Sequence, residues 1–140
     1  MFLTDADYTV VIGTKAFDVL RQSDDANMEQ AEGMAIEELS GYLRPKYDIE
    51  AIFSATGDER NNLIVMFCVD IALNHLVAAV PGRMGAETRE ARYKRAIEWL
   101  NSVQKGSVVP DLPVVLSSET GEMASGATSW GSEKRTNNSW

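Results

Sequence analysis

The chain contains little cysteine and histidine, and each scarcity excludes a class of site. Cys68 is the only cysteine, so no internal disulfide can form, and folding in a reducing cytosol is expected. It lies in the most apolar segment, which predicts an unreactive buried thiol. His75 is the only histidine. Metal sites and acid–base sites need several convergent ligands, so we predict no catalytic, metal-binding or cofactor-binding residues and no enzymatic activity.

The carboxylates do not compensate for this lack. Asp70 and His75 lie five residues apart in one expected helix, about 140° apart around its axis, so they do not share a face. The neighbours Glu37 and Glu38 point about 100° apart, as do Asp24 and Asp25, and are expected to be solvated charges. Asp70 is expected to be buried, and its default partner is an arginine of the last helix, Arg92 or Arg95.

We also expect no targeting or membrane segment. The first residues have neither the basic region nor the apolar region of a signal peptide. The longest apolar stretch, residues 63–80, contains Asp70, Asn74 and His75 in its middle. One aspartate at a bilayer centre costs about 3 kcal/mol, so this stretch predicts a central helix of a soluble protein and no membrane contact.

Basic residues are outnumbered, with 13 Lys and Arg against 21 Asp and Glu and a net charge of −8. Specific binding to duplex DNA needs clustered cations, so it is not expected to be the main task. The charge is uneven: residues 1–60 carry 5 basic and 13 acidic side chains, whereas residues 83–105 carry 6 and 3. Oppositely charged ends favour head-to-tail docking of copies, as in a ring, although ordinary solvated helix faces explain them equally well.

Apolar spacing predicts an all-α fold, a small helical bundle formed by residues 1–106. Thr4 with Asp7 forms a capping-box pattern for a short first helix, which Gly13 ends before a second short helix. Ser23 is expected to cap a long helix that ends before Pro45, and residues 46–55 are expected to be an irregular connector. A second capping-box pattern, at 56–59, predicts the start of the central helix. The last helix is expected to run from near Ala86 to Lys105, with Gly106 after its end.

Residues 107–140 form a different unit, an extended polar C-terminal arm. Residues 108–116 hold two prolines and several β-branched residues, which suits an extended arm or a short β segment. Residues 117–140 are rich in Ser, Gly, Thr and Asn and bury too little apolar surface to fold alone. A polar arm of this kind is typical of a segment that docks on another chain.

We predict two groups of partner-binding residues. Tryptophans in a polar arm are interpreted as interface anchors, because aromatic residues dominate interface energies. The arm group is Trp130, Trp140, Val108, Val109, Leu112, Val114, Val115 and Leu116. The second group is the one basic cluster, with Arg89, Arg92 and Arg95 beside Lys94. It could contact an acidic surface, or it could be a mixed solvated face interleaved with glutamates.

Three stretches taken in order resemble one known family. They are Ala35-Ile36-Glu37-Glu38 with Tyr42-Leu43-Arg44-Pro45-Lys46-Tyr47-Asp48-Ile49, then Val69-Asp70-Ile71-Ala72, then Arg92-Tyr93-Lys94-Arg95-Ala96-Ile97-Glu98-Trp99-Leu100 with Gly106. Their order and spacing are similar to those of the Mu-like prophage family of small neck proteins, akin to the head–tail connector (adaptor) proteins of tailed bacteriophages. The resemblance covers roughly residues 2–110 and does not include the tail.

The resemblance implies a structural virion protein. Such connectors form a homo-oligomeric ring, about twelve copies, beneath the portal protein at the neck, and they join the capsid to the next neck or tail-completion protein. Genomic DNA passes through the ring without specific binding, and an acidic channel wall suits this passage. The implied location is the virion, with assembly in the host cytoplasm. The alternative hypothesis is a helical protein-binding or regulatory module that uses its arm and belongs to no particle.

Overall fold

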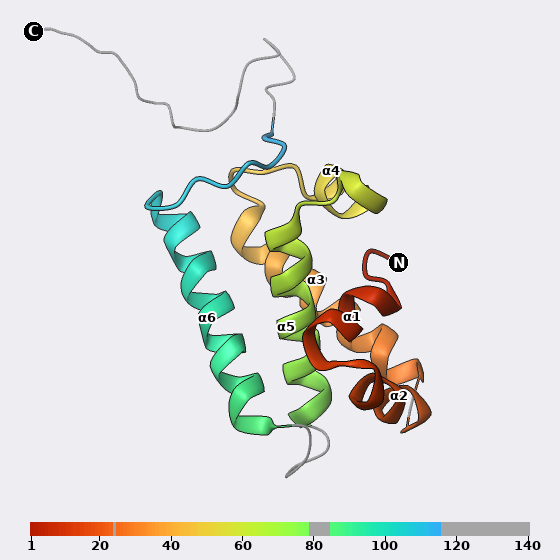
Figure 1. Ribbon diagram of the computed structural model, residues 1–140. Coiled ribbons are helices and arrows are strands. Elements are labelled where there is room, and N and C mark those ends of the chain that lie inside the picture. Colours follow the sequence, from red (N-terminus) through yellow and green to blue (C-terminus); the bar gives the residue numbers. More distant parts are fainter. Residues whose placement is uncertain (24, 79–84, 116–140) are drawn as a thin grey trace, which may run out of the picture.

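The fold is all-α, as predicted. The computed structural model describes residues 1–23, 25–78 and 85–115 (Figure 1). These residues form α1 (Asp5–Ile12), α2 (Thr14–Ser23), α3 (Asp25–Leu43), α4 (Ile49–Ser54), a 3-10 turn η1 (Gly57–Glu59), α5 (Asn62–Ala78) and α6 (Ala86–Lys105). Within these ranges, no helix combines the length and the apolar character that crossing a membrane requires.

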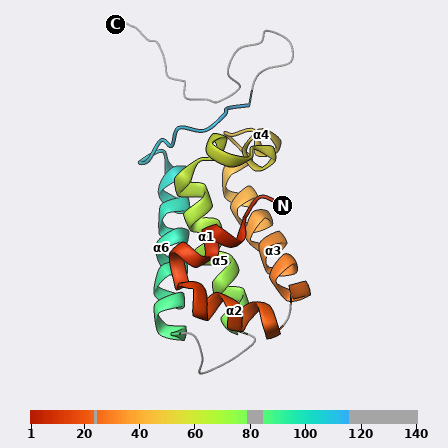
Figure 2. The ribbon, with the colours of Figure 1, turned by 45° about the vertical axis from the view of Figure 1, so that its right-hand side comes forward.

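Helix α5 is the centre of the bundle. It packs against α3, α6 and α1, while α2 packs on α1 and α3 (Figures 1 and 2). Its sequence is apolar on most sides, which is the pattern of a helix that other helices surround. The prediction of a central helix is therefore confirmed.

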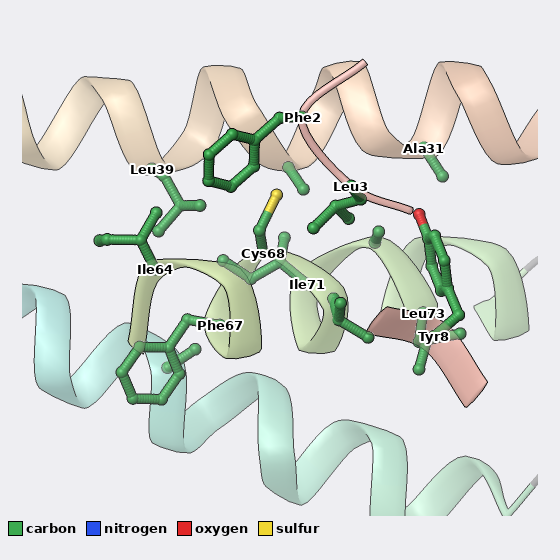
Figure 3. Packing of buried hydrophobic residues seen from close by; sticks show 14 of the residues in the cluster. Phe2, Leu3, Tyr8, Ala31, Leu39, Ile64, Phe67, Cys68, Ile71 and Leu73 are labelled. Carbon is green, nitrogen blue, oxygen red and sulfur yellow. The ribbon is translucent and has the colours of Figure 1, made fainter. Parts of the chain in front are cut away.

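The core runs along α5. Figure 3 shows α5 between α3 and α6, with Ile64, Cys68 and Ile71 directed into the space between the helices. The N-terminal segment enters this core, because Phe2 and Leu3 lie beside Cys68 and are each 4% exposed. The extended residues before α1 thus belong to the packed interior.

Most predicted helix boundaries are confirmed. Thr4 and Asp7 form the complete capping box of α1. Helix α3 ends at Leu43, two residues before Pro45, but Ser23 is the last residue of α2 and not the predicted cap, since α3 begins at Asp25. Gly106 follows α6 with φ 84° and ψ 4°, a left-handed conformation that glycine adopts without strain, and its N–H donates to carbonyls of the last turn.

Two expectations about the middle of the chain are wrong. Residues 46–55 are not an irregular connector, because residues 49–54 form α4, which Asp48 caps by accepting the N–H of Ala51 at 3.1 Å. The pattern at 56–59 does not open the central helix; it forms η1, and Thr56 makes no side-chain cap there. Asn61 caps α5 instead, since its Oδ1 accepts the N–H groups of Leu63 and Ile64 at 3.0 and 3.1 Å.

The first residues of the predicted arm fold back on the bundle. Leu112 is only 8% exposed and joins the core. Val114 forms an isolated antiparallel bridge with Tyr47, and the described residues hold no longer strand. Two backbone bonds flank this bridge: Asp48 N–H to Pro113 O at 2.9 Å and Val115 N–H to Lys46 O at 3.3 Å. The burial of Leu112 and these backbone bonds together hold the segment on the bundle.

Candidate interaction surfaces

The buried carboxylate Asp70 has the arginine partner that the sequence predicted. Nε of Arg92 on α6 donates to Oδ1 of Asp70 on α5 at 2.6 Å, and the Asp70 side chain is fully buried. Arg95, the alternative candidate, lies over the Phe67 ring instead. A buried carboxylate with one strong partner is a structural ion pair that ties α5 to α6.

Arg89 lies beside this pair without completing it. Its Nε and Nη1 are buried, as is Oδ2 of Asp70, and none of these atoms has a hydrogen-bond partner in the part of the chain that the structure describes. Burial lowers the pKa of Arg89, and the nearby Arg92 lowers it further. Two arginines against one carboxylate leave this end of the α5–α6 contact with one excess positive charge.

The predicted basic cluster is therefore split. Arg92 is engaged internally and Arg89 is half-buried. Lys94 is exposed and pairs with Glu90 at 3.0 Å one turn earlier. Arg95 is exposed, and its guanidinium carbon lies 6.0 Å from the centre of the Phe67 ring. Of the three predicted arginines, Arg95 is the one best placed to contact another molecule.

His75 belongs to a second polar cluster that links three helices. Glu38 on α3 accepts a hydrogen bond from the Tyr93 hydroxyl of α6 at 2.5 Å, and its other oxygen lies 3.3 Å from Nε2 of His75 on α5. The hydrogen bond to Glu38, followed by burial, raises the pKa of Tyr93 to about 12. This arrangement is a structural contact at the edge of the bundle. In the described ranges, no group of three His, Cys, Asp or Glu side chains could hold a metal ion.

The N-terminal segment is held by two contacts that the sequence did not predict. Arg60 donates to both oxygens of Asp7, at 2.7 and 3.3 Å, and to the Phe2 carbonyl at 2.8 Å. Burial alone would raise the pKa of Asp7, but the bonds from Arg60 and Thr4 outweigh it and hold this pKa below its usual value. Glu32, a buried residue of α3, accepts the N–H of Leu3 at 2.8 Å. These partners are 29 to 58 residues apart in sequence, so no local pattern reveals them.

The predicted arm residues have different locations. Leu112 is buried within its own chain, Val108, Val114 and Val115 are half-buried, and Val109 is 81% exposed. The structure brings Val114 to Tyr47. Leu116, Trp130 and Trp140 lie outside the described residues.

One side of the α5–α6 pair is not covered by another described helix. Leu63, Met66 and Asn74 share a side of α5 by their spacing, and they are exposed or half-exposed. Arg92, Arg95 and Trp99 share a side of α6 in the same way. The two sides adjoin, because the Trp99 and Phe67 rings are 4.9 Å apart and Arg92 reaches Asp70. We call these six residues the α5–α6 strip.

A second uncovered surface is the outer face of α3. It is formed by Gln30, Gly33, Met34, Glu37 and Gly41, opposite the residues that pack on α5, and all five are exposed. Met34 is 48% exposed, although methionine side chains are usually buried. An added Cβ at Gly33 or Gly41 would have no neighbour within 4 Å. Each glycine costs a helix about 1 kcal/mol relative to alanine, and no described contact within the chain explains either one.

The comparison with known protein families identifies a match over most of the chain. The model of a protein family described as "Bacteriophage Mu, Gp36" matches residues 3–127 of the 140. The match contains every described helix and extends beyond residue 110, so it also includes part of the predicted arm. No curated protein and no solved structure matches the chain.

Proposed function

Since the chain belongs to the bacteriophage Mu Gp36 family and is a Mu-like phage protein, we propose that it is a structural virion protein, a subunit of the head–tail connector. In this proposal about twelve copies form a ring under the portal protein, and the ring extends the DNA channel and receives the next neck or tail-completion protein. The family match over residues 3–127 is the observation that carries the proposal.

The chemistry of the chain supports a positional role. A net charge of −8 gives a wall that repels phosphate, so DNA would slide past without sticking. The two buried carboxylates of the described residues hold parts of the chain together: Asp70 pairs with Arg92 of α6, and Glu32 accepts the N–H of Leu3. A protein whose polar interior only fixes the bundle suits assembly rather than catalysis, and we propose no enzymatic activity.

The proposed mechanism divides the chain into two parts. The helical bundle supplies the flanks that meet in the ring, and the segment after α6 supplies an anchor to a neighbouring component. Residues 107–115 begin this segment on the surface of the bundle, beside α4 (Figure 1). The anchor would therefore leave the bundle from a fixed point, which limits where it can reach.

Deletion of the coding sequence from an inducible prophage tests the proposal. Head–tail joining is expected to fail, so electron microscopy of the lysate should show separate DNA-filled heads and free tails. The full-length chain supplied from a plasmid should restore joined particles. A lysate of normal particles without the chain would contradict the connector function and favour the regulatory binding module.

A further inference from the structure

We propose that the α5–α6 strip of one copy binds the outer face of α3 of a second copy. The proposal rests on the connector function above and names the surfaces that join neighbouring subunits. Both surfaces carry exposed apolar side chains, and no described helix of the same chain covers either one.

The composition of the strip suits an interface. It combines Trp99, Met66 and Arg95, and these residue types are enriched at protein interfaces. Leu63 is 43% exposed at one end of the strip. Arg95 makes no ion pair within the described residues, and its guanidinium group lies over the Phe67 ring. An apolar centre with a free guanidinium at its edge favours a partner that offers both apolar surface and a carboxylate.

The outer face of α3 offers both. Helix α3 carries five acidic side chains and no basic one, whereas α6 carries five basic and three acidic side chains. Of the acidic residues, Glu37 is exposed near Met34, and within the described residues its one ion pair is a loose, exposed contact with Arg44 at 3.8 Å. The two surfaces therefore complement each other in charge as well as in apolar content.

The glycines of α3 fit the same partner. Gly33 and Gly41 lie on either side of Glu37, two turns apart, with open space where a Cβ would be. Their lack of side chains lets another surface approach the helix backbone closely. A bulky group such as the Trp99 indole could then lie beside Met34 without displacing it.

The geometry makes the contact head-to-tail. Helix α5 lies between α3 and α6, so the two surfaces are on different flanks of one molecule (Figure 3). An interface that joins two different surfaces repeats from copy to copy, and it closes into a ring when the rotation between copies permits. A contact of this kind, unlike a symmetric dimer, can build the proposed connector.

Disulfide cross-linking tests which surfaces meet. Met34→Cys and Leu63→Cys replace exposed residues. Cys68→Ala serves as the background, so that the introduced cysteines are the only thiols in the chain. Under oxidation the full-length chain with both cysteines should give a ladder of covalent multimers. An equal mixture of the two single-cysteine chains should stop at dimers, and each alone should stay monomeric. Val19→Cys on α2, paired with Leu63→Cys, is the matched control and should give no ladder.

Charge reversal tests the chemistry of the contact. Arg95→Glu should lower the yield of the ladder at least about tenfold, and adding Glu37→Arg should restore it. Lys94→Glu makes the same change of charge at the neighbouring position, outside the strip, and should leave the yield unchanged. If Arg95→Glu instead abolishes retention of duplex DNA and leaves the ladder intact, the strip binds nucleic acid and the proposal is wrong.

The experiment separates this proposal from the connector function when it is done on both purified chain and purified particles. If the chain is present in particles but forms no ladder in either sample, the proposed interface is wrong and the connector function is not contradicted. A ladder in the purified chain, with no chain in particles, supports the interface and contradicts the connector function. Dimers from Met34→Cys alone would show a symmetric contact and would also overturn the interface.

Discussion

Nε of Arg92 lies 2.6 Å from Oδ1 of Asp70, and this buried contact is the principal charged link between α6 and α5 in the described residues. Arg92 is also part of the α5–α6 strip, so one residue both holds the helix pair together and contributes to the surface beside it. The stability of the bundle and the shape of the strip are therefore coupled.

Removing one partner of this pair is expected to be costly. Arg92→Met leaves Asp70 buried without its donor, and such a loss costs about 3–5 kcal/mol of unfolding free energy. The double variant Arg92→Met with Asp70→Leu should recover most of this loss, because it leaves no uncompensated charge. Urea denaturation followed by circular dichroism measures both, with Lys94→Met as the exposed control. Equal stability of Arg92→Met and the native chain would contradict a structural role for the pair.

The Asp7–Arg60 pair predicts a loss of stability in acid. The folded pKa of Asp7 is lowered, so its contribution is complete above the unfolded value of about 3.9 and is lost as the pH falls through the folded value. The native chain should therefore lose stability from about pH 5 downward, and Asp7→Asn should lose less over the same range. Denaturation midpoints measured across that range test this. If the denaturation midpoints of the two proteins fell equally with pH, the contact with Arg60 would not lower the pKa of Asp7.

Tyr93 should ionise unusually late. Its pKa is about 12 because its hydroxyl donates to Glu38 and because it is partly buried, so Glu38→Gln should move the pKa toward the ordinary value of about 10. The contribution of Tyr93 to stability is complete below about pH 10 and is lost as the pH rises through 12. Ultraviolet titration of the tyrosinates, with Tyr93→Phe to identify the signal, measures the shift. An unchanged titration in Glu38→Gln would contradict the contact.

Leu112 should stabilise the bundle from outside the helices. It is 8% exposed, and Leu112→Ala should cost about 2–3 kcal/mol, at the low end for a buried leucine because the residue lies at the edge of the core. Val109→Ala, 81% exposed, should change stability by no more than about 0.5 kcal/mol. A chain ending at residue 115 should match the full chain in stability. A chain ending at Gly106 should keep its helices but unfold at lower urea, and equal midpoints would contradict the packing of 107–115.

The fold was predictable from sequence where local signals determine it. The Thr4–Asp7 capping box, Pro45 after the long helix and Gly106 after the last helix each act within a few residues, and all three boundaries are confirmed. Helix α4 was missed because its six residues are too few to show the helical period in the sequence. The pattern at 56–59 misled because Asn61, two residues before Leu63, supplies the cap that α5 uses.

The candidate surfaces were less predictable, because they depend on contacts between distant segments. The basic cluster was visible in the sequence, but the engagement of Arg92 with Asp70 and the exposure of Arg95 follow from how α5 and α6 pack. The fold-back of the segment that contains Leu112 depends on the bridge between Tyr47 and Val114, which are 67 residues apart. Leu63 carried no sequence signal, since α5 is apolar on most sides. Met34 was not predicted to be exposed, although it lies away from the residues of α3 that pack on α5.

Quantitative mass spectrometry of purified virus particles tests the connector function most directly. Peptides of this chain should be present at a near-equal molar ratio to those of the portal protein, as expected for a stoichiometric ring beneath it. Intact, DNA-filled and tailed particles that contain the portal protein but lack this chain would contradict the account.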